Sequence, residues 1–510
     1  MDVLNSRRIP QVLSIVRKLP VHTIGPMSRV QRFGGGLWLL SLLVGACLAQ
    51  AADRPNILFI LVDDLGTEWI SSYGAEEIET PNIDRLAAGG MRFTNAYSMP
   101  QCTPTRATLL TGQYPFRHGW VNHWDVPRCG AGGHFDPRRN LTFARLLRGA
   151  GYATAVAGKW QINDFRVQPD VLQQHGFDEW CMWTGYEAQN PPSAERYWDP
   201  YLFVRDPATG ESSSRGYKGK FGADLFVDYL TDFMRRHRDE PMLLYYPMAL
   251  THTPLVATPQ EPNASEPMAK HKAMVRYTDR MVGRLVGALD DLGLRERTII
   301  FFTTDNGTSR GIEGRMNGRP VRGGKAALTE NGTRMPFIVN GPGRVPAGTV
   351  TTALTDFSDL LPTFVDLAGA DLPNDETFDG RSIAPVLLGK ESRGPRDWIL
   401  SMGYGPARLD DKGVRPARDY ADRVVRGRRF KLHVLDGAPA KLYDLVDDPW
   451  EETNLISSDQ AEHVAARKRL EEVVAKFPKQ DGRPRYDPLL PQPWDISREA
   501  NEKMWNREGR

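Results

Sequence analysis

The sequence has little of what marks several special classes of protein. Only four of its 510 residues are cysteine, too few for a small disulfide-rich fold. Its long apolar run, residues 37–49, spans 13 residues and is too short for a transmembrane helix. With 25% charged and 40% hydrophobic residues, the chain is neither disordered nor collagen-like. Its length suits one large α/β domain with an appendage, or about three domains.

The apolar run itself has the pattern of a secretory signal. It follows Arg29 and Arg32 and leads into Ala49-Gln50-Ala51. We therefore predict that residues 1–52 are absent from the mature protein, which is exported to the periplasm or secreted. Lipoprotein anchoring at Cys47 is a second interpretation. No later run is long and apolar enough for a transmembrane anchor.

Removing residues 1–52 changes the charge and the cysteine count. This segment holds six of the 65 basic residues and one of the 63 acidic ones, which leaves 59 bases and 62 acids. A chain with this balance has no basic surplus for nucleic acid, so we expect no such partner. The remaining cysteines, Cys102, Cys129 and Cys181, are odd in number, so at least one is unpaired. Cys129 and Cys181 could form a disulfide.

Apolar runs of strand length alternate with longer amphipathic segments. The runs lie at 56–62, 152–156, 242–246, 298–304 and 337–339, and helices are expected at 82–88, 141–149 and 277–292. Near-continuous apolar strands are typical of a sheet buried on both faces. This alternation predicts a doubly wound α/β domain at 53–385.

The pattern changes after residue 385. Short strand-like pieces at 423–425, 430–434 and 441–443 precede an amphipathic segment that carries Leu470 and Val473. They predict a smaller antiparallel sheet plus helix in a C-terminal subdomain at 386–510. We expect the residues from 478 onward to form an irregular surface tail.

Polar residues follow the predicted strands directly. Asp63-Asp64 ends the first strand, Asp305-Asn306 ends the one at 298–304, and Lys159 and His252 follow two others. Ligand sites in open α/β sheets lie beyond the carboxyl ends of the strands. Each acidic pair alone could be an ordinary turn. Together, their oxygen donors favour a site for a hard cation, Ca²⁺ or Mg²⁺.

The segment from Cys102 to Gly112 has the features of a short helix. Pro104 suits the first turn, Gly112 suits the end, and Arg106 lies one turn after Cys102. A reactive group at Cys102 would face the positive end of the helix beside a guanidinium, an arrangement suited to an oxyanion ester. The alternative is a buried structural cysteine.

Three segments, taken in order, resemble the formylglycine-dependent sulfatases of the alkaline-phosphatase superfamily. They are RPNILFILVDDLG from Arg54, CTPTR from Cys102 and GKW from Gly158. The likeness continues to LYDL from Leu442 and ETNL from Glu452. A CxPxR motif alone is a weak signal, but this order makes it specific. The resemblance implies a large mixed sheet flanked by helices.

The same resemblance implies a mechanism and a cofactor. Cys102 is expected to be oxidised by a formylglycine-generating or sulfatase-maturating enzyme. The hydrated aldehyde would then attack the sulfur of a sulfated small molecule or glycan. The residues that match the family's divalent-cation ligands, usually for Ca²⁺ with Mg²⁺ as the alternative, are Asp63, Asp64, Cys102, Asp305 and Asn306.

Four further positions match catalytic residues of the family. Arg106 is expected to steady the formylglycine hydroxyl, and Lys159 and Lys325 to hold sulfate oxygens. His252 resembles the histidine near the leaving-group oxygen, where it could serve as general acid. Taken singly, each of these residues could as well be an ordinary surface side chain.

One position departs from the family pattern. Many members have a histidine two residues after the lysine of GKW, where this sequence has Gln161. An amide cannot act as a base near neutral pH. Either His118, His123 or metal-bound oxygens take the proton, or sulfate release is slow. Gln161 leaves open a noncatalytic protein that binds sulfated glycans. A phosphomonoester or phosphonate hydrolase of the same superfamily also stays open, because a metal ion and an arginine suit either tetrahedral anion.

Overall fold

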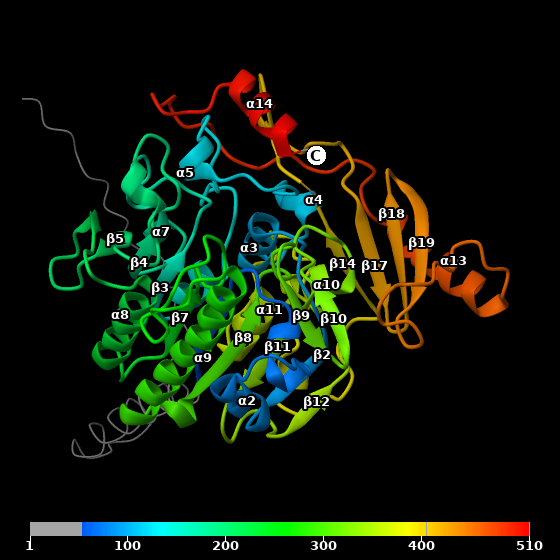
Figure 1. The fold of residues 1–510 in the computed structure, drawn as a ribbon, viewed down its shortest axis with the longest axis horizontal. Helices are drawn as coiled ribbons and strands as arrows, with labels where there is room; N and C mark the ends of the chain where they lie inside the picture. Colours follow the sequence, from blue (N-terminus) through cyan, green and yellow to red (C-terminus); the bar gives the residue numbers. More distant parts are fainter. Residues whose placement is uncertain (1–53, 404, 509–510) are drawn as a thin grey trace, which may run out of the picture. The chain divides into compact units, whose positions relative to one another are not determined.

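The computed structural model describes residues 54–403 and 405–508 (Figure 1). The predicted signal segment, residues 1–52 with Cys47, lies outside the described residues. Export and lipoprotein anchoring therefore stay predictions. Within the described part of the chain, no helix has the length and apolar character needed to cross a bilayer.

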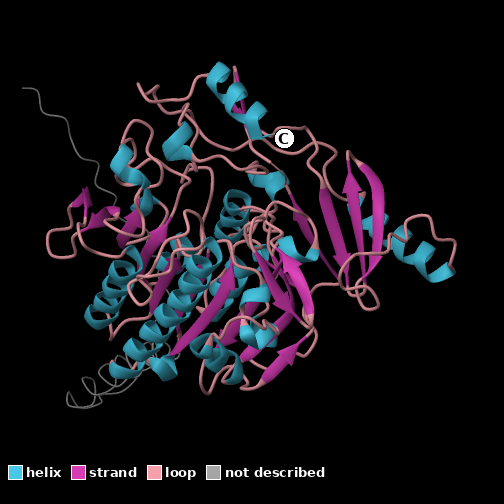
Figure 2. Cartoon of the chain, viewed as in Figure 1, coloured by secondary structure: helices cyan, strands magenta, loops and turns pink. Residues whose placement is uncertain are grey.

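A large mixed sheet is built around the strands predicted from apolar runs (Figure 2). Its central strands are parallel in the order β8-β1-β7-β3, and β11 joins β8 antiparallel. The central strands are β8 (Thr298–Thr304), β1 (Asn56–Val62), β7 (Met242–Pro247), β3 (Ala153–Lys159) and β11 (Arg334–Asn340). The flanking strands are β12 (Thr349–Thr351), β13 (Thr355–Asp356), β2 (Met91–Tyr97), β4 (Glu179–Trp183), β5 (Tyr201–Arg205) and β6 (Ser212–Gly216).

Alternate residues of β1 divide between two hydrophobic cores, because successive side chains of a strand point to opposite faces. Phe59 packs with Phe143 and Phe364 on one face. Ile60 belongs to the core of the other face, which also contains Leu230 and Met281. Helices therefore cover both faces, which confirms the predicted fold class.

The principal helices pack against the two faces of the sheet. One face carries α2 (Pro81–Ala88), α8 (Gly222–Arg236) and α9 (Pro267–Asp291), and the other carries α3 (Cys102–Thr111), α6 (Phe143–Gly149) and α11 (Leu360–Leu367). The shorter elements are α4 (Pro115–His118), α5 (Val126–Cys129), α7 (Val171–Gln174), α10 (Glu330–Thr333), α12 (Ala384–Leu387), and the hairpins β9 (Glu313–Met316) with β10 (Arg319–Arg322) and β15 (Arg408–Asp410) with β16 (Gly413–Arg415).

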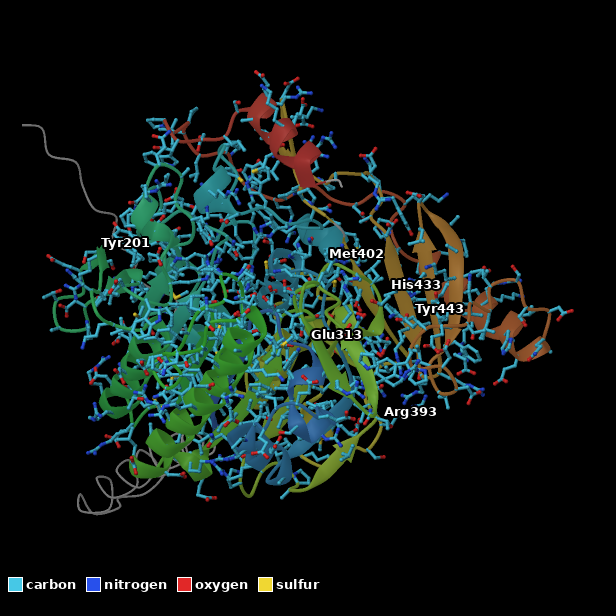
Figure 3. All side chains as sticks on the ribbon, in the orientation of Figure 1. Tyr201, Glu313, Arg393, Met402, His433 and Tyr443 are labelled. Carbon is cyan, nitrogen blue, oxygen red and sulfur yellow. The ribbon has the colours of Figure 1, made fainter. Side chains whose placement is uncertain are left out.

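A second, antiparallel sheet follows, as predicted. Its order is β14-β17-β18-β19, and α13 packs Leu470 and Val473 into its core. His433 and Tyr443 project from its adjacent strands β18 and β19, with ring centroids 5.4 Å apart (Figure 3). The elements are β14 (Trp398–Met402), β17 (Arg423–Gly427), β18 (Phe430–Leu435), β19 (Ala438–Asp444) and α13 (Ala461–Val474).

The expectation of an irregular surface tail from residue 478 is wrong in two respects. Asp481 is buried and accepts a 2.6 Å hydrogen bond from Arg423 of β17. The chain also forms α14 (Arg498–Glu508), whose charged sequence carries no apolar periodicity. A buried ion pair and apolar contacts of Tyr486, Ile496 and Met504 with the core hold this segment in place, and these isolated apolar residues form no periodic pattern that would predict it.

Candidate active site

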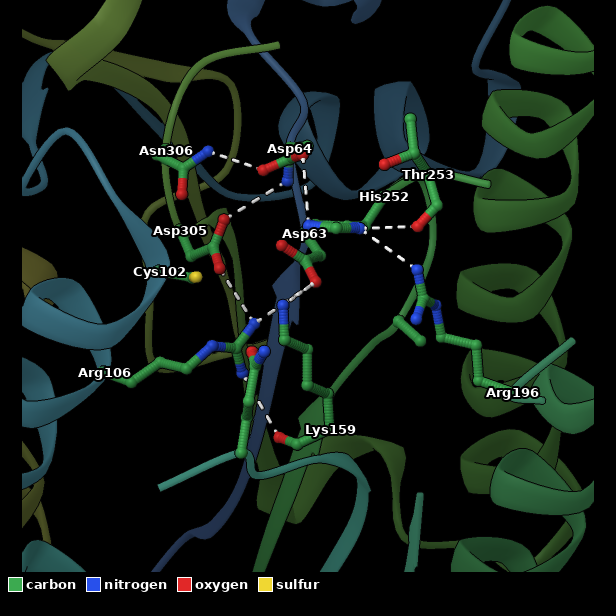
Figure 4. A network of polar contacts seen from close by, with 12 residues as sticks. Asp63, Asp64, Cys102, Arg106, Lys159, Arg196, His252, Thr253, Asp305 and Asn306 are labelled. Atoms are coloured by element: carbon green, nitrogen blue, oxygen red, sulfur yellow. Dashed lines mark hydrogen bonds and ion pairs between the residues drawn. The ribbon is translucent and has the colours of Figure 1, made fainter. Parts of the chain in front are cut away.

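The two acidic pairs lie together at the carboxyl ends of β1 and β8 (Figure 4). The backbone N–H of Asp64 donates to Asp305 Oδ1 over 3.2 Å, and Asn306 Nδ2 donates to Asp64 Oδ1 over 2.8 Å. The four residues of this acidic cluster are all buried: Asp63, Asp64, Asp305 and Asn306. Asp64 has a φ of 60°, an uncommon conformation for a non-glycine residue that often occurs at functional sites.

Each carboxylate of the cluster lies against at least one cationic side chain. Lys159 Nζ lies 2.5 Å from Asp63 Oδ2, and Lys325 Nζ lies 2.7 Å from Asp64 Oδ2. Arg106 Nη2 lies 2.8 Å from Asp305 Oδ2. The lysine and arginine residues predicted from the resemblance are therefore all brought to the acidic cluster, although they come from three separate segments.

These cations keep Asp63 and Asp64 charged. Burial alone would raise the pKa of Asp63, but Lys159, His252 and Arg106 outweigh it and hold that pKa well below its usual range. Burial would likewise raise the pKa of Asp64, but the charge of Lys325 outweighs it, and the pKa of Asp64 is also lowered. Asp63 and Asp64 are thus ionised, the form that binds a metal ion, whereas burial and the charge of Asp63 raise the pKa of Asp305 well above its ordinary value.

Two oxygens of the cluster lack a donor among the described residues. Asp63 Oδ1 and Asn306 Oδ1 are buried and make no hydrogen bond there. A buried oxygen without a partner costs about 1–3 kcal/mol, and more if it is charged. Ligand atoms of Asp63, Asp64 and His252 also lie within 4.8 Å of one another. This set of hard oxygen donors fits a divalent cation such as Ca²⁺.

Cys102 is the first residue of α3, as its sequence context predicts. Gly112 ends that helix with a φ of 65°, a conformation that favours glycine. The thiol is 3% exposed and lies beside Asp305 and Asn306 in Figure 4. Among the described residues Cys102, Cys129 and Cys181 are all free thiols, so the structure contains no Cys129–Cys181 disulfide.

His252 lies across the cluster from Cys102 (Figure 4). Its Nε2 is 3.8 Å from Asp64 Oδ2, and its Nδ1 is 3.1 Å from Arg196 Nη2 and 2.7 Å from the Thr253 carbonyl oxygen. Burial and the charge of Lys325 lower the pKa of His252 to about 3. The ring is therefore neutral at pH 7 and carries one N–H that it can donate to an oxygen.

Sequence reasoning missed Arg196. Its guanidinium is buried, lies over the rings of Trp183 and Tyr186, and holds the His252 ring from behind. Nothing in the local sequence singles out this arginine, because it sits in a loop more than 50 residues from its histidine partner. Only the fold brings the two together.

The structure separates the histidines that the sequence left as candidates near Cys102. His123 Nδ1 lies 3.6 Å from Cys102 Sγ and 3.0 Å from Thr103 Oγ1. Burial lowers the pKa of His123 to about 4, so its ring is neutral at pH 7. His118 instead pairs its Nε2 with Thr108 Oγ1 over 3.1 Å and accepts a bond from the Trp120 N–H.

Glu68 is a second residue that sequence reasoning missed. Its buried carboxylate accepts a 2.5 Å hydrogen bond from Thr308 Oγ1, which in turn accepts one from the Gly66 N–H over 2.8 Å. This chain of bonds ties the loop after β1 to the loop after β8, the two loops that carry the acidic pairs. Burial raises the pKa of Glu68 to about 7.

The raised pKa of Glu68 predicts a pH-dependent stability. Because its folded-state pKa exceeds the ordinary glutamate value of 4.5, the free energy of unfolding should fall as pH rises from about 4.5 to 7. Glu68→Gln removes this titration and keeps an acceptor for Thr308. We expect the variant to be more stable by up to about 3 kcal/mol at pH 8 and equal to the parent near pH 4.5. Urea unfolding at both pH values measures the difference.

The exposed Glu211, changed to Gln, is the matched control and should show no such pH-dependent difference. A Glu68→Gln protein that is less stable than the parent at pH 8 would show that the carboxylate is held ionised.

The arrangement of strands, helices and buried charges defines a hydrolase of the alkaline-phosphatase type. The Sulfatase family model matches residues 55–370, and the model for the C-terminal region of N-sulphoglucosamine sulphohydrolase matches residues 324–479. The chain therefore belongs to the sulfatase family and is a sulfuric ester hydrolase.

Several known proteins are similar to most of the chain. N-acetylgalactosamine-6-sulfatase of Sus scrofa is 35% identical over 69% of this chain and 70% of its own length. Arylsulfatase A of Bos taurus is 34% identical over 86% of this chain and 91% of its own length. The solved structure described as Ps i-CgsB is 26% identical, with a TM-score of 0.69 over 89% of this chain and 97% of its own.

Proposed function

We propose that this sulfatase hydrolyses an organic sulfate monoester to an alcohol and inorganic sulfate by means of a formylglycine formed from Cys102 and a bound divalent cation. The observation that carries the proposal is the position of Cys102, at the start of a buried helix and next to Asp305 in the cluster that holds the unpartnered oxygens of Asp63 and Asn306 (Figure 4). Such a site places a nucleophile and a cation against one tetrahedral anion.

The expected ion is Ca²⁺, with Mg²⁺ as the alternative. Asp63, Asp64, Asp305, Asn306 and the oxidised residue 102 would hold it. A bound cation would polarise a sulfate oxygen and favour ionisation of the attacking hydroxyl. The described residues support this role through the ionised, buried carboxylates of Asp63 and Asp64.

The remaining side chains of the site have separate proposed roles toward the sulfate group and the leaving alcohol. Lys159 and Lys325 supply positive charge for the sulfate oxygens, and both are already directed into the cluster. Arg106 holds Asp305 and also donates a 3.3 Å hydrogen bond to the backbone carbonyl oxygen of Lys159, the last residue of β3. His252 would hydrogen-bond through its ring N–H to the oxygen of the departing alcohol, and only its imidazolium form could transfer a proton to that oxygen as general acid.

The proposal extends to the biological context of the enzyme. Formylglycine requires a formylglycine-generating or sulfatase-maturating enzyme as a partner. The substrate is a sulfated small molecule or glycan, since the relatives include both N-acetylgalactosamine-6-sulfatase and the steryl-sulfatase of Rattus norvegicus. We also propose a catalytic domain at 53–385, a C-terminal subdomain at 386–510, and export directed by a signal within residues 1–52.

Two measurements test this function. Mass spectrometry of the peptide that contains residue 102 should show a loss of roughly 18 Da, the change from thiol to aldehyde. Turnover of an aryl sulfate should exceed that of the matched aryl phosphate. An unshifted peptide from a host that contains a maturating enzyme would contradict the formylglycine.

The phosphate comparison matters because the fold is shared with another hydrolase. The solved phosphonate monoester hydrolase of Agrobacterium radiobacter has a TM-score of 0.60 to this chain at 21% identity. A clear preference for the aryl phosphate, or for a phosphonate ester, would favour that alternative.

A further inference from the structure

His123 is held against Cys102 by contacts that fix both its ring and its backbone. The ring nitrogen Nδ1 lies 3.6 Å from Cys102 Sγ and 3.0 Å from Thr103 Oγ1. The His123 N–H donates to the Gly405 carbonyl over 3.1 Å, and the Ala407 N–H donates to the His123 carbonyl over 2.8 Å. The half-buried ring is thus clamped at the first residue of α3 rather than placed there by a flexible loop.

Gln161 does not contact Cys102 in this way. Its side-chain Nε2 donates to Asp125 Oδ2 over 2.9 Å, and its backbone carbonyl oxygen accepts a 3.2 Å hydrogen bond from the Val126 N–H. Both bonds go to the segment that directly follows His123. Gln161 also has a φ of 68°, so its backbone turns sharply at this point. Its amide therefore supports the His123 segment instead of touching the nucleophile.

The other histidines near the cluster are committed elsewhere. Both ring nitrogens of His118 have partners, Thr108 Oγ1 and the Trp120 N–H. His252 is held by Arg196 and faces Asp64. Of these three histidines, only His123 has a contact to the sulfur of residue 102 within hydrogen-bond reach.

We infer that His123 is a catalytic residue that accepts the proton of residue 102 when sulfate leaves the enzyme, and that Gln161 positions it through Asp125. The inference rests on the proposed formylglycine chemistry. His123 Nδ1 takes the proton from the hydroxyl that residue 102 retains, and the electron pair of that O–H bond forms the aldehyde C=O. The C–O bond to sulfate breaks, and its electron pair leaves on the sulfate oxygen. Water then rehydrates the aldehyde, and the imidazolium returns its proton to solvent.

This role predicts a defect in one step only. With His123→Gln, attack on sulfur and loss of the alcohol should proceed as in the parent, but release of sulfate should slow by about 10²–10⁴-fold, the usual contribution of a positioned base. A rapid-quench assay with an aryl sulfate should give a burst of about one phenol per enzyme. Intact-protein mass spectrometry during turnover should show a gain of about 80 Da, the mass of a retained sulfuryl group.

The two supporting variants separate catalysis from folding. His123→Ala should show the same burst, and Gln161→Ala should show a smaller fall in the slow phase because it only loosens the His123 segment. His463→Gln is the matched histidine control and should turn over like the parent, because His463 lies in α13 and its ring bonds to Ser458 and packs on Phe430. Thermal unfolding establishes that each variant is folded.

Two results would overturn the inference. One is a folded His123→Gln enzyme with an unchanged steady-state rate. The other is a burst and steady-state rate that fall together, with no sulfate retained. Failure of the proposed function is seen separately, in the parent enzyme, as an unmodified thiol at residue 102 or no release of sulfate.

Discussion

Replacing Cys102 with alanine is expected to lower kcat for an aryl sulfate by at least about 10⁴-fold, because it removes the nucleophile and not merely a contact. The fold should survive. The thiol is small, and its loss from a buried position should lower the free energy of unfolding by about 1–2 kcal/mol. Steady-state turnover and thermal unfolding of the purified variant measure the two effects.

The matched control for this variant is Cys181→Ala. Cys181 is also a buried free thiol, but it lies in β4, in the core that contains Trp183 and Leu202. Its removal should change stability by a similar amount and leave kcat within about twofold, as expected for a group that acts only through packing. A Cys102→Ala enzyme that keeps a tenth or more of the parent rate would rule out residue 102 as the nucleophile.

Asp63→Asn is expected to have the second largest effect. The carboxylate accepts from Lys159 over 2.5 Å and lies 3.9 Å from Arg106, so its neutralisation leaves two buried cations with less counter-charge. It also removes a charged ligand of the proposed ion. We expect kcat/KM to fall by about 10³-fold or more and Ca²⁺ to bind at least about 10-fold more weakly. Removing one partner of a buried pair should also destabilise the ion-free protein by about 3–5 kcal/mol.

Calorimetric titration with Ca²⁺ and thermal unfolding with and without a chelator test these expectations. Asp291→Asn, at the exposed end of α9, is the matched control and should bind Ca²⁺ like the parent. If Asp63→Asn bound Ca²⁺ with parental affinity, the acidic cluster would not be the metal site.

The parts of the structure that sequence reasoning predicted carry local signals. The apolar run of β1 ends in Asp63-Asp64, and parallel pairing with β8 brings Asp305 to the same edge of the sheet. Pro104 and Gly112 bound α3 because each suits one end of a helix. In these cases the bounds of the strand or helix follow from apolar periodicity and capping residues within about ten residues of sequence.

The parts that it missed depend on contacts between distant segments. Arg196 meets His252 across 56 residues of sequence, and Glu68 meets Thr308 across 240. The sequence left His118 and His123 as candidates without a choice between them, since both follow the helix that begins at Cys102. Only the packing of the Gly405 segment selects one of them, and no periodic pattern encodes that packing.

The backbone clamp on His123 has a consequence for how this enzyme can change over evolution. The clamp comes from Gly405 and Ala407, which lie beyond β14, in the part of the chain matched by the separate C-terminal family model. The two halves are therefore not interchangeable modules. A chimera that takes its C-terminal region from another sulfatase would hold the His123 segment beside residue 102 differently, even if every residue of the N-terminal region were kept.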